Sequence, residues 1–296
     1  MKKVGFVSIV GKTNAGKSTL LNLIMKQKIS IATSKPQTTR NSIQGIYSDD
    51  DSQIIFIDTP GVVKSHQKLD QYMNKQIAYS LIDVDALIIL VDASIPFDKE
   101  KDIMLKDRFE KDVPTFVVFN KIDLTNIYLI NSLKKEYQLM FPNAKLIEIS
   151  CKDKFNIDEL IKEVKQVLPN GEKYYPDDMK SNHPISFVIG EIIREKILMY
   201  TSQEVPHCAA CKIESMKKIN DTLHIHATIL VERDSQKKII VGKNGQMIKK
   251  IGMASRKEIE NLLSRKINLM TFVRVEPHWR DSTTYLKEFG YSEDNE

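Results

Sequence analysis

The sequence predicts an α/β domain, with a mostly parallel sheet and helices on both faces, followed by a smaller α+β domain. Three observations support this prediction. The chain has 296 residues, which is long for a single domain. Short apolar runs alternate with helical patterns as far as residue 168. Residues 169–184 then contain three prolines and few aliphatic side chains, so we expect an extended linker between the two domains.

The first domain is expected over residues 1–168. Its apolar runs lie far enough apart for a crossover helix between successive strands, which favours parallel pairing. Apolar residues at helical spacing from Ile157 to Leu168 indicate its last helix, with Asn156 and Glu159 as a capping pair. The expected strands are residues 4–10, 54–57, 86–91, 115–119 and 146–149.

The second domain is expected over residues 185–280, with a C-terminal tail over residues 281–296. Strict alternation predicts a strand in which the odd-numbered residues from Leu223 to Val231 share one apolar face. Trp279, the single tryptophan, has two open interpretations, a base-stacking surface or a core position. The expected elements are helices near residues 191–200 and 248–262 and strands over residues 222–231 and 268–275.

The composition excludes some broad classes. Apolar residues make up 42% and charged residues 28% of the chain, which is not typical of a disordered protein. The longest apolar runs, such as residues 86–91, are far shorter than the roughly 20 residues that a membrane-spanning helix needs. Three cysteines cannot form a disulfide framework, which favours a reducing compartment and therefore the cytoplasm.

Positive charge is concentrated late in the chain. The net charge of +5 is too small to indicate a nucleic-acid partner by itself. Residues 235–274, however, hold ten Lys and Arg against two Glu, whereas residues 275–296 hold two basic and six acidic residues. The basic segment is therefore a candidate for contact with an anionic partner.

A glycine-rich motif, GKTNAGKS, follows the first expected strand and precedes an apolar helix. This is the G-x-x-x-x-G-K-[ST] pattern, in which the backbone curls so that its N–H groups point at phosphate oxygens. Lys17 should reach the β- and γ-phosphates, and the Ser18 hydroxyl should bind Mg²⁺. The expected nucleotide-binding residues here are Gly11, Lys12, Thr13, Asn14, Ala15, Gly16, Lys17, Ser18 and Thr19.

A second motif, Asp58-Thr59-Pro60-Gly61, ends the next strand of the expected parallel sheet. The Asp58 carboxylate is placed to bind Mg²⁺, and the Gly61 N–H is placed near the γ-phosphate. Thr59 and Pro60 complete this candidate nucleotide-contacting segment. The motif therefore predicts a sensor for the terminal phosphate.

A third motif, Asn120-Lys121-Ile122-Asp123, ends a further strand. The Asp123 carboxylate can accept hydrogen bonds from both N1–H and the 2-amino group of guanine. Adenine lacks both donors, and a buried carboxylate without a partner is costly. The motif therefore predicts a guanine nucleotide, with Asn120 and Lys121 as further contacts, and argues against an ATP-dependent kinase.

Together these motifs resemble those of the small translation-factor-like GTPases, an α/β P-loop NTPase fold known as the G domain. The resemblance implies that Ser150, Cys151 and Lys152 form the loop whose backbone contacts the guanine oxygen, although the usual pattern is Ser-Ala-Lys. It also implies that a threonine of Pro36-Gln37-Thr38-Thr39-Arg40 completes the coordination of Mg²⁺ when GTP is bound, and Thr39 is favoured over Thr38.

The resemblance further implies GTP hydrolysis, with Lys17, Thr39 and Gly61 as the catalytic candidates. Many such GTPases place a glutamine just after this glycine to orient the attacking water. Val62 and Val63 stand there instead, so unaided turnover should be slow. Asn14 is a candidate K⁺ ligand beside the phosphates, as in some related GTPases.

The basic segment contains Gly242-Lys243-Asn244-Gly245. The expected order of helix, two strands, short helix, GxxG, helix and strand matches a type II KH module, which clamps about four single-stranded nucleotides. The glycines let the backbone approach phosphates closely, and Lys243, Lys249 and Lys250 supply positive charge. We expect Gly242, Lys243, Asn244, Gly245, Lys249 and Lys250 to bind RNA.

The pairing of the two domains closely resembles the Era family of ribosome-assembly GTPases. The resemblance implies that the GTP or GDP state controls binding of small-subunit, 16S-type ribosomal RNA near its 3′ end and of the 30S precursor. It implies a cytoplasmic monomer that does not bind DNA, and it leaves open a peripheral association with the inner membrane face. The alternative is a guanine-nucleotide-gated protein or membrane adaptor whose C-terminal module does not bind RNA.

Overall fold

The computed structural model describes residues 1–35, 37–62, 66–109, 112–202 and 204–291. These residues form two compact units, and two short segments from the first half of the chain belong to the C-terminal one. The first unit comprises Met1–Ser30, Asn41–Val62 and Asn74–Asn182. The second comprises Ile31–Arg40, Val63–Met73 and His183–Glu296.

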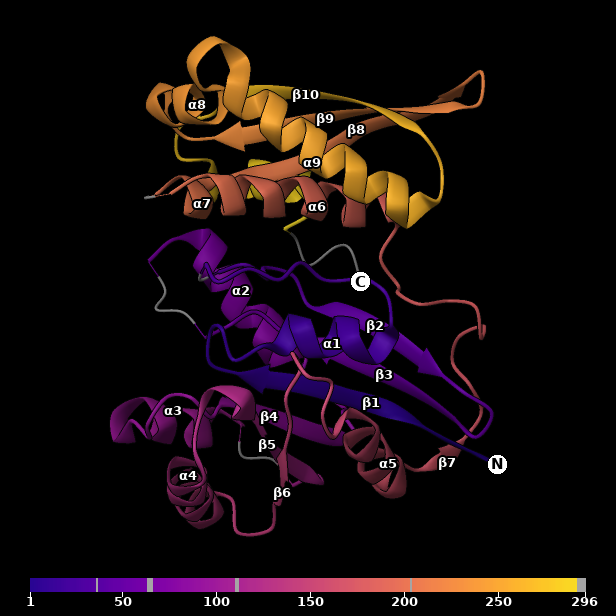
Figure 1. Cartoon of the computed structure of the whole chain (residues 1–296), viewed down its shortest axis with the longest axis vertical. Helices are drawn as coiled ribbons and strands as arrows, with labels where there is room; N and C mark the ends of the chain where they lie inside the picture. The colour runs from indigo at the N-terminus through magenta and orange to yellow at the C-terminus, as the bar shows by residue number, and fades with distance from the viewer. Residues whose placement is uncertain (36, 63–65, 110–111, 203, 292–296) are drawn as a thin grey trace. The chain divides into compact units, whose positions relative to one another are not determined.

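The first unit is built on a seven-stranded, mostly parallel sheet with the order β2-β3-β1-β4-β5-β6, and a short β7 pairs with β1 (Figure 1). Its strands are β1 (Lys2–Gly11), β2 (Ile43–Ser48), β3 (Ser52–Asp58), β4 (Ala86–Asp92), β5 (Thr115–Asn120), β6 (Lys145–Glu148) and β7 (Asn170–Gly171). The helices that begin in it or enter it are α1 (Lys17–Met25), α2 (Lys68–Tyr79), α3 (Lys99–Phe109), the 3₁₀ turn η1 (Ile122–Leu124), α4 (Ile127–Met140) and α5 (Ile157–Val167).

Helices cover both faces of this sheet, which explains why its central strands are buried along most of their length. Every residue of β3 is buried. On one face, Ile77 of α2, Leu105 of α3 and Leu133 of α4 share a core with Leu87 and Val117 of the sheet. Helices α1 and α5 lie on the other face (Figure 1). The α/β fold class and the five expected strands are confirmed, with ends shifted by a few residues.

Two strands of the first unit, β2 and β7, were not expected from the sequence. Strand β2 pairs antiparallel with β3, so that Ile43 lies opposite Asp58. Its sequence, IQGIYS, contains Gln44 and Gly45 and gives only a weak apolar signal.

The predicted capping pair at the start of α5 was wrong, because Asn156 adopts a left-handed conformation (φ 58°) and makes no side-chain cap. Its amide instead donates to the Glu148 carbonyl oxygen at 3.0 Å.

Residues 169–182 are extended and hydrogen-bonded to the first unit. Gly171 pairs with Lys2 at the start of β1. The backbone N–H groups of Tyr174 and Tyr175 donate to the Gln53 side-chain oxygen at 2.8 and 2.9 Å. The predicted linker over residues 169–184 therefore has specific partners, and the division between the units falls after Asn182.

The second unit is an α+β module with a three-stranded sheet of order β10-β9-β8, in which β10 and β9 are parallel and β8 is antiparallel. The odd-numbered residues of β9 are buried as expected. The order of elements agrees with the type II KH pattern. The elements are α6 (Ile185–Tyr200), α7 (Val205–Cys208), β8 (Ala210–Ile219), β9 (Thr222–Val231), α8 (Asp234–Val241), η2 (Lys243–Gly245), α9 (Gln246–Leu263), β10 (Ile267–Val275), η3 (Trp279–Asp281) and α10 (Thr283–Glu288).

Trp279 occupies a core position. Its side chain is fully buried, and its indole N–H donates to the Cys208 carbonyl oxygen at 2.9 Å. It packs with Phe289 and Tyr291 from the expected tail, of which residues 292–296 lie outside the described part. The core interpretation is therefore correct, and base stacking by this ring is excluded. Within the described residues, no helix is long and apolar enough to cross a membrane.

Candidate functional site

The phosphate-loop motif connects β1 to α1. Gly11 has φ +148° and Gly16 has φ +104°, and a side chain at either position would collide with neighbouring atoms, the Leu90 carbonyl oxygen and the Asn120 amide respectively. Between them the backbone curls around the ammonium group of Lys17, which donates to the carbonyl oxygens of Gly11 and Lys12, each at 3.0 Å. This geometry explains why the motif needs glycine at these two positions.

Lys17 and Asp58 are both buried, and each affects the titration of the other. Burial lowers the pKa of Lys17 to about 8, while the nearby Asp58 carboxylate opposes the shift. Burial raises the pKa of Asp58, against hydrogen bonds from Ser18 and Ser30 and the charge of Lys17. The pair places a cation and an anion side by side at the end of β3, as expected for a site that holds both phosphate and metal.

The Asp58 carboxylate has one oxygen bound and one oxygen open. Its Oδ2 accepts hydrogen bonds from the hydroxyls of Ser18 at 2.6 Å and Ser30 at 2.8 Å. Its Oδ1 is buried and has no hydrogen-bond partner among the described residues. Hydroxyl and carboxylate oxygens are the ligands that Mg²⁺ prefers, so this donor set fits the ion. Ser30 lies outside every motif, and no sequence signal pointed to it.

Gly61 lies against the phosphate loop, because a side chain on it would collide with the Thr13 methyl group. Thr59 is also buried, and its hydroxyl donates to the Ile9 carbonyl oxygen of β1 at 2.9 Å. Val62 packs on the core beside α2, α3 and α4, and Val63 lies outside the described residues. The segment from Asp58 to Gly61 is thus fixed beside the loop that it was predicted to serve.

Asn120 joins two loops that are far apart in sequence. Its side-chain amide donates to the Ala15 carbonyl oxygen of the phosphate loop at 2.8 Å. Its side-chain oxygen accepts from the Cys151 backbone N–H at 3.1 Å. The neighbouring Lys121 pairs with Asp92 at the end of β4, at 2.5 Å. Asp92 was missed in the sequence, although an acidic residue ending a buried strand was an available signal.

Asp123 is oriented by the loop at residues 150–152. The Ser150 hydroxyl donates to its Oδ1 at 2.8 Å and holds the pKa of Asp123 below its ordinary value, so the carboxylate is ionised at neutral pH. Its Oδ2 is buried and accepts no hydrogen bond from the described residues, with the Lys152 ammonium 3.5 Å away. A buried, charged oxygen that can still accept is what recognition of guanine N–H groups requires.

Cys151 stands where the usual pattern has alanine, and this difference does not disturb the loop at residues 150–152. The residue contributes its backbone N–H to Asn120, and its side chain is buried. Burial raises the pKa of the Cys151 thiol to about 12, so the group is a neutral thiol at physiological pH. A small neutral side chain therefore replaces the usual alanine without adding charge to the site.

Thr39 belongs to the second unit and is not grouped with Ser18 and Asp58, which lie in the first. Thr39 is buried. The adjacent Arg40 is fully buried and donates to the carbonyl oxygens of Ala209 and His207, both at 2.9 Å. Its guanidinium also lies 5.9 Å from the centre of the Trp279 ring. The segment expected to close over the metal is thus packed within the C-terminal unit.

The GxxG motif connects α8 to α9 in the second unit. Gly242 has φ 72° and ψ 174°, a conformation that is essentially restricted to glycine, and a Cβ there would lie 2.7 Å from the Met247 Cβ. Asn244 (φ 52°) and Gly245 (φ 74°) are left-handed as well. Lys243 and Asn244 are exposed at the tip. The turn therefore presents an exposed lysine beside glycine backbone that a phosphate can approach closely.

A groove of about 330 Å³ runs between α9 and β10. Lys249 lines it as expected, and Arg256, seven residues along the same helix face, lines it too. Lys250 does not line this groove, because its ammonium lies 4.3 Å from the centre of the Tyr200 ring. Arg256 was missed although its helical spacing from Lys249 was visible in the sequence. The full lining is Ile248, Lys249, Gly252, Met253, Arg256, Asn268, Leu269 and Thr271.

Comparison with known proteins decides the family. The chain is 47% identical over 292 residues to GTPase Era of Lactobacillus delbrueckii subsp. bulgaricus, with 98% of this chain and 96% of the relative covered. The chain belongs to the Era family of GTPases. It is also 45% identical over 289 residues to GTPase Era of Lacticaseibacillus paracasei, covering 97% of this chain and 96% of that one. The expected resemblance to the Era family is confirmed.

Family models and solved structures agree with this membership. Residues 6–121 match the model described as 50S ribosome-binding GTPase, and residues 204–280 match the KH domain. A variant of Aquifex aeolicus Era bound to GDP.AlF4⁻ has a TM-score of 0.94 and 36% identity, covering 98% of this chain and 99% of that one. A structure of Era with MgGDPNP and nucleotides 1506–1542 of 16S ribosomal RNA has the same score and identity, covering 99% and 100%.

Proposed function

We propose that this protein is a GTPase switch that binds GTP or GDP with Mg²⁺ through residues 1–168 and 16S-type ribosomal RNA through residues 185–280. The observation that carries the nucleotide assignment is the buried Oδ2 of Asp123, which accepts no hydrogen bond from the described residues. Asn120 joins the neighbouring loop at residues 150–152 to the phosphate loop. The Era relatives favour the small ribosomal subunit over the large subunit that the broader GTPase model names.

The nucleotide-binding roles follow from the geometry of the first unit. The backbone of residues 11–19 cradles the phosphates, and the Lys17 ammonium exchanges loop carbonyls for phosphate oxygens. Ser18 and Asp58 would hold Mg²⁺, which when bound neutralises charge on the β- and γ-phosphates. Gly61 offers its N–H to the γ-phosphate. Thr39 is assigned as the additional metal ligand of the GTP-bound state.

Hydrolysis is proposed to be slow without a partner. The residue after Gly61 is Val62, which packs on the core and has no polar group to orient water. Asn14, in a left-handed conformation (φ 63°) within the phosphate loop, is the proposed K⁺ ligand. Turnover measured in KCl against NaCl at equal ionic strength tests this role, since loss of activity in Na⁺ supports it and equal rates contradict it.

The RNA-binding role rests on the GxxG turn and the groove beside it. Lys243 at the turn and Lys249 and Arg256 along the groove supply charge for the phosphate backbone. The groove also offers Asn268 and Thr271 for hydrogen bonds to base edges. The proposed target is the 3′ region of 16S-type RNA within the 30S precursor, because the Era structure with 16S nucleotides covers this chain almost completely.

Calorimetry of the full chain tests the nucleotide assignment. Tight binding of GDP and GTP with Mg²⁺, and no binding of ADP at the same concentration, is the expected result. Equal affinity for ADP would overturn the guanine assignment and reinstate an ATP-dependent enzyme.

A charge-reversal pair tests the RNA assignment. Lys249→Glu with Arg256→Glu removes both groove cations, whereas Lys99→Glu with Lys135→Glu makes the same charge change at exposed positions in α3 and α4. Affinity for an oligonucleotide copied from the 16S 3′ end should fall at least about tenfold in the first pair and much less in the second. Equal losses in both pairs would favour a nucleotide-gated adaptor without an RNA-binding module.

We also propose an oligomeric state and a cellular location for this protein. The protein is proposed to act as a monomer in the cytoplasm, where ribosomes assemble. Sedimentation of the nucleotide-bound protein tests the monomer, and co-flotation with anionic vesicles tests the peripheral membrane association that the family resemblance leaves open.

A further inference from the structure

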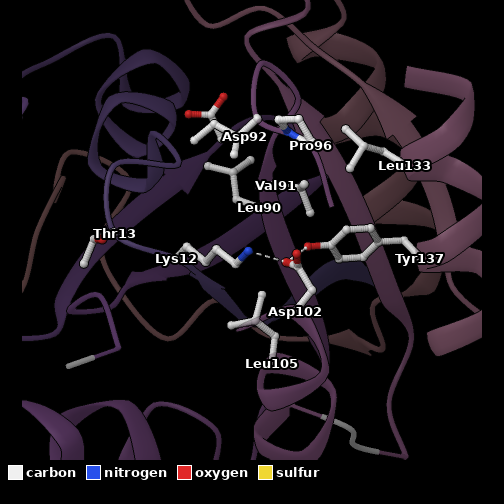
Figure 2. A pocket seen from close by; sticks show the side chains of 11 residues that line it. Lys12, Thr13, Leu90, Val91, Asp92, Pro96, Asp102, Leu105, Leu133 and Tyr137 are labelled. Atoms are coloured by element: carbon white, nitrogen blue, oxygen red, sulfur yellow. Dashed lines mark hydrogen bonds and ion pairs between the residues drawn. The ribbon is translucent and has the colours of Figure 1, made fainter. Parts of the chain in front are cut away.

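A polar cluster of Lys12, Asp102 and Tyr137 connects the phosphate loop to α3 and α4 (Figure 2). At its centre is Asp102 of α3, whose side chain is 3% exposed. The Tyr137 hydroxyl of α4 donates to Asp102 Oδ1 at 2.5 Å, and the Asp98 backbone N–H donates to Oδ2 at 2.8 Å. Lys12 reaches from the phosphate loop to pair with the same carboxylate at 2.6 Å.

The carboxylate is held rigidly by its surroundings. Tyr137 is almost completely buried, and its ring meets those of Phe97 and Phe119 edge-on, with centroid distances of 5.9 and 5.7 Å. Burial and the hydrogen bond to Asp102 both raise the pKa of the Tyr137 hydroxyl, so it remains a donor. An acceptor fixed in this way by α3 and α4 is a well-defined partner for a side chain from the phosphate loop.

Both the side chain and the backbone of Lys12 have polar partners. Its ammonium is bound by Asp102, while its backbone carbonyl oxygen accepts from the Lys17 ammonium at 3.0 Å. Its side chain lines a pocket together with Leu90, Leu105 and Leu133 (Figure 2). The side chain thus fixes the backbone position of a residue whose carbonyl in turn contacts the phosphate-binding lysine.

We propose that Lys12 is a positioning residue for nucleotide binding: its ion pair with Asp102 anchors the phosphate loop to α3 in the conformation that receives the phosphates. This inference rests on the proposed function of the loop. Loops that are already ordered lose less conformational entropy when a ligand binds. The ion pair therefore strengthens binding although the Lys12 side chain does not touch the nucleotide. The competing explanation is that Lys12 leaves Asp102 and binds a phosphate directly.

A double-mutant cycle in the full chain separates these explanations. Lys12→Gln and Asp102→Asn each break the ion pair, so each should weaken binding of GDP and of a non-hydrolysable GTP analogue by about 5- to 10-fold. The double variant should be no weaker than either single variant, because both remove the same anchor. KM for GTP should rise in parallel with the dissociation constants.

Two further variants serve as controls. Lys12→Arg keeps the charge pair and should restore affinity to within about twofold of the wild type. Tyr137→Phe removes the hydroxyl bonded to Asp102 and lowers thermal stability but keeps the ion pair, so its KM should stay near that of the wild type.

Three outcomes would overturn the proposal. Unchanged or tighter binding by Asp102→Asn, with weaker binding by Lys12→Gln, would make Lys12 a direct phosphate ligand. Variants that melt earlier but bind like the wild type would leave the pair a stability role only. A KM in Tyr137→Phe as high as in Lys12→Gln would attribute the effect to general loosening. Failure of the wild type to bind GDP would be a different result, because it would refute the proposed function itself.

Discussion

Asn120 and Ala15 are 105 positions apart in sequence, yet the side-chain amide of one donates to the backbone carbonyl of the other at 2.8 Å. The same asparagine accepts from the Cys151 N–H, so a single side chain holds together the phosphate loop and the loop at residues 150–152. Because Asn120 is 2% exposed, neither bond competes with bulk water. Asn120 therefore stabilises the site as a whole, and its own contact with a nucleotide is a separate matter.

Replacing Asn120 with alanine should weaken GDP binding by at least about tenfold, because two buried backbone groups lose partners at about 1–3 kcal/mol each. Asn126→Ala is a matched control. Asn126 caps α4 by accepting from the Leu129 N–H, so its loss costs about 0.5–2 kcal/mol of stability away from the phosphate loop. Calorimetric GDP titrations of both variants compare them, and equal losses of affinity would contradict the bridging role.

Asp123→Asn should convert the base preference of the site. The asparagine amide can donate to a carbonyl at purine C2, which xanthine has, whereas guanine presents an amino donor there. GDP affinity should fall by about 100-fold or more, and xanthosine diphosphate should then bind better than GDP. Competition between the two nucleotides measures this directly. A variant that still prefers GDP would show that Asp123 does not read the base.

Gly61→Ala should impair GTP binding and hydrolysis, because the added methyl group would collide with the Thr13 methyl group of the phosphate loop. Thr13→Ser in the same chain removes that methyl and leaves the Thr13 Cα, 3.1 Å away, as the nearest atom. Affinity for a GTP analogue should then recover in part. Thr13→Ser alone is the control, and the absence of any recovery would show that Gly61 acts through its N–H or backbone freedom and not through this contact.

Gly252 and Gly242 should respond in opposite directions to alanine. Gly252 lies inside α9 with no atom within 4 Å of an added Cβ, so Gly252→Ala should raise stability by about 0.5–1 kcal/mol. Gly242→Ala should lower stability by about 1–3 kcal/mol, because its φ and ψ values and its approach to Met247 exclude a side chain. Thermal melts of the two variants measure the difference.

Gly252→Ala should also change RNA binding, because Gly252 lines the groove between α9 and β10. The more stable protein should bind the 16S oligonucleotide more weakly, since the methyl group occupies space that RNA would use. Unchanged RNA affinity in this variant would place the RNA elsewhere on the second unit.

Much of the nucleotide site could be predicted because its motifs are local. Gly11 and Gly16 adopt conformations that few other residues reach, and Asp58 and Asp123 follow buried strands whose apolar runs are visible in the sequence. The predicted capping pair at Asn156 was wrong, although its pattern is local too. A short-range pattern suggested a cap, but the Glu148 carbonyl was a better partner for the Asn156 amide in the folded chain.

Other features could not be predicted because they depend on contacts between distant segments. Lys249 and Lys250 are adjacent in sequence and equally basic, yet one lines the groove and the other lies over the Tyr200 ring. Arg40 looked like part of a metal-binding segment, whereas its guanidinium is buried against the backbone of residues 207 and 209. No local pattern distinguishes these outcomes.

The sequence by itself determined the fold class, the two modules and the three nucleotide motifs, because backbone curls, strand ends and side-chain alternation depend on neighbouring residues. The tertiary structure alone decided that Asn120 joins two loops, that Lys12 is paired with Asp102, and that Thr39 is grouped with the C-terminal unit. The physical reason is that these contacts join residues that are far apart along the chain. A buried hydrogen bond or ion pair is set by which polar groups the fold brings within about 3 Å of each other, and separation along the chain does not encode that distance.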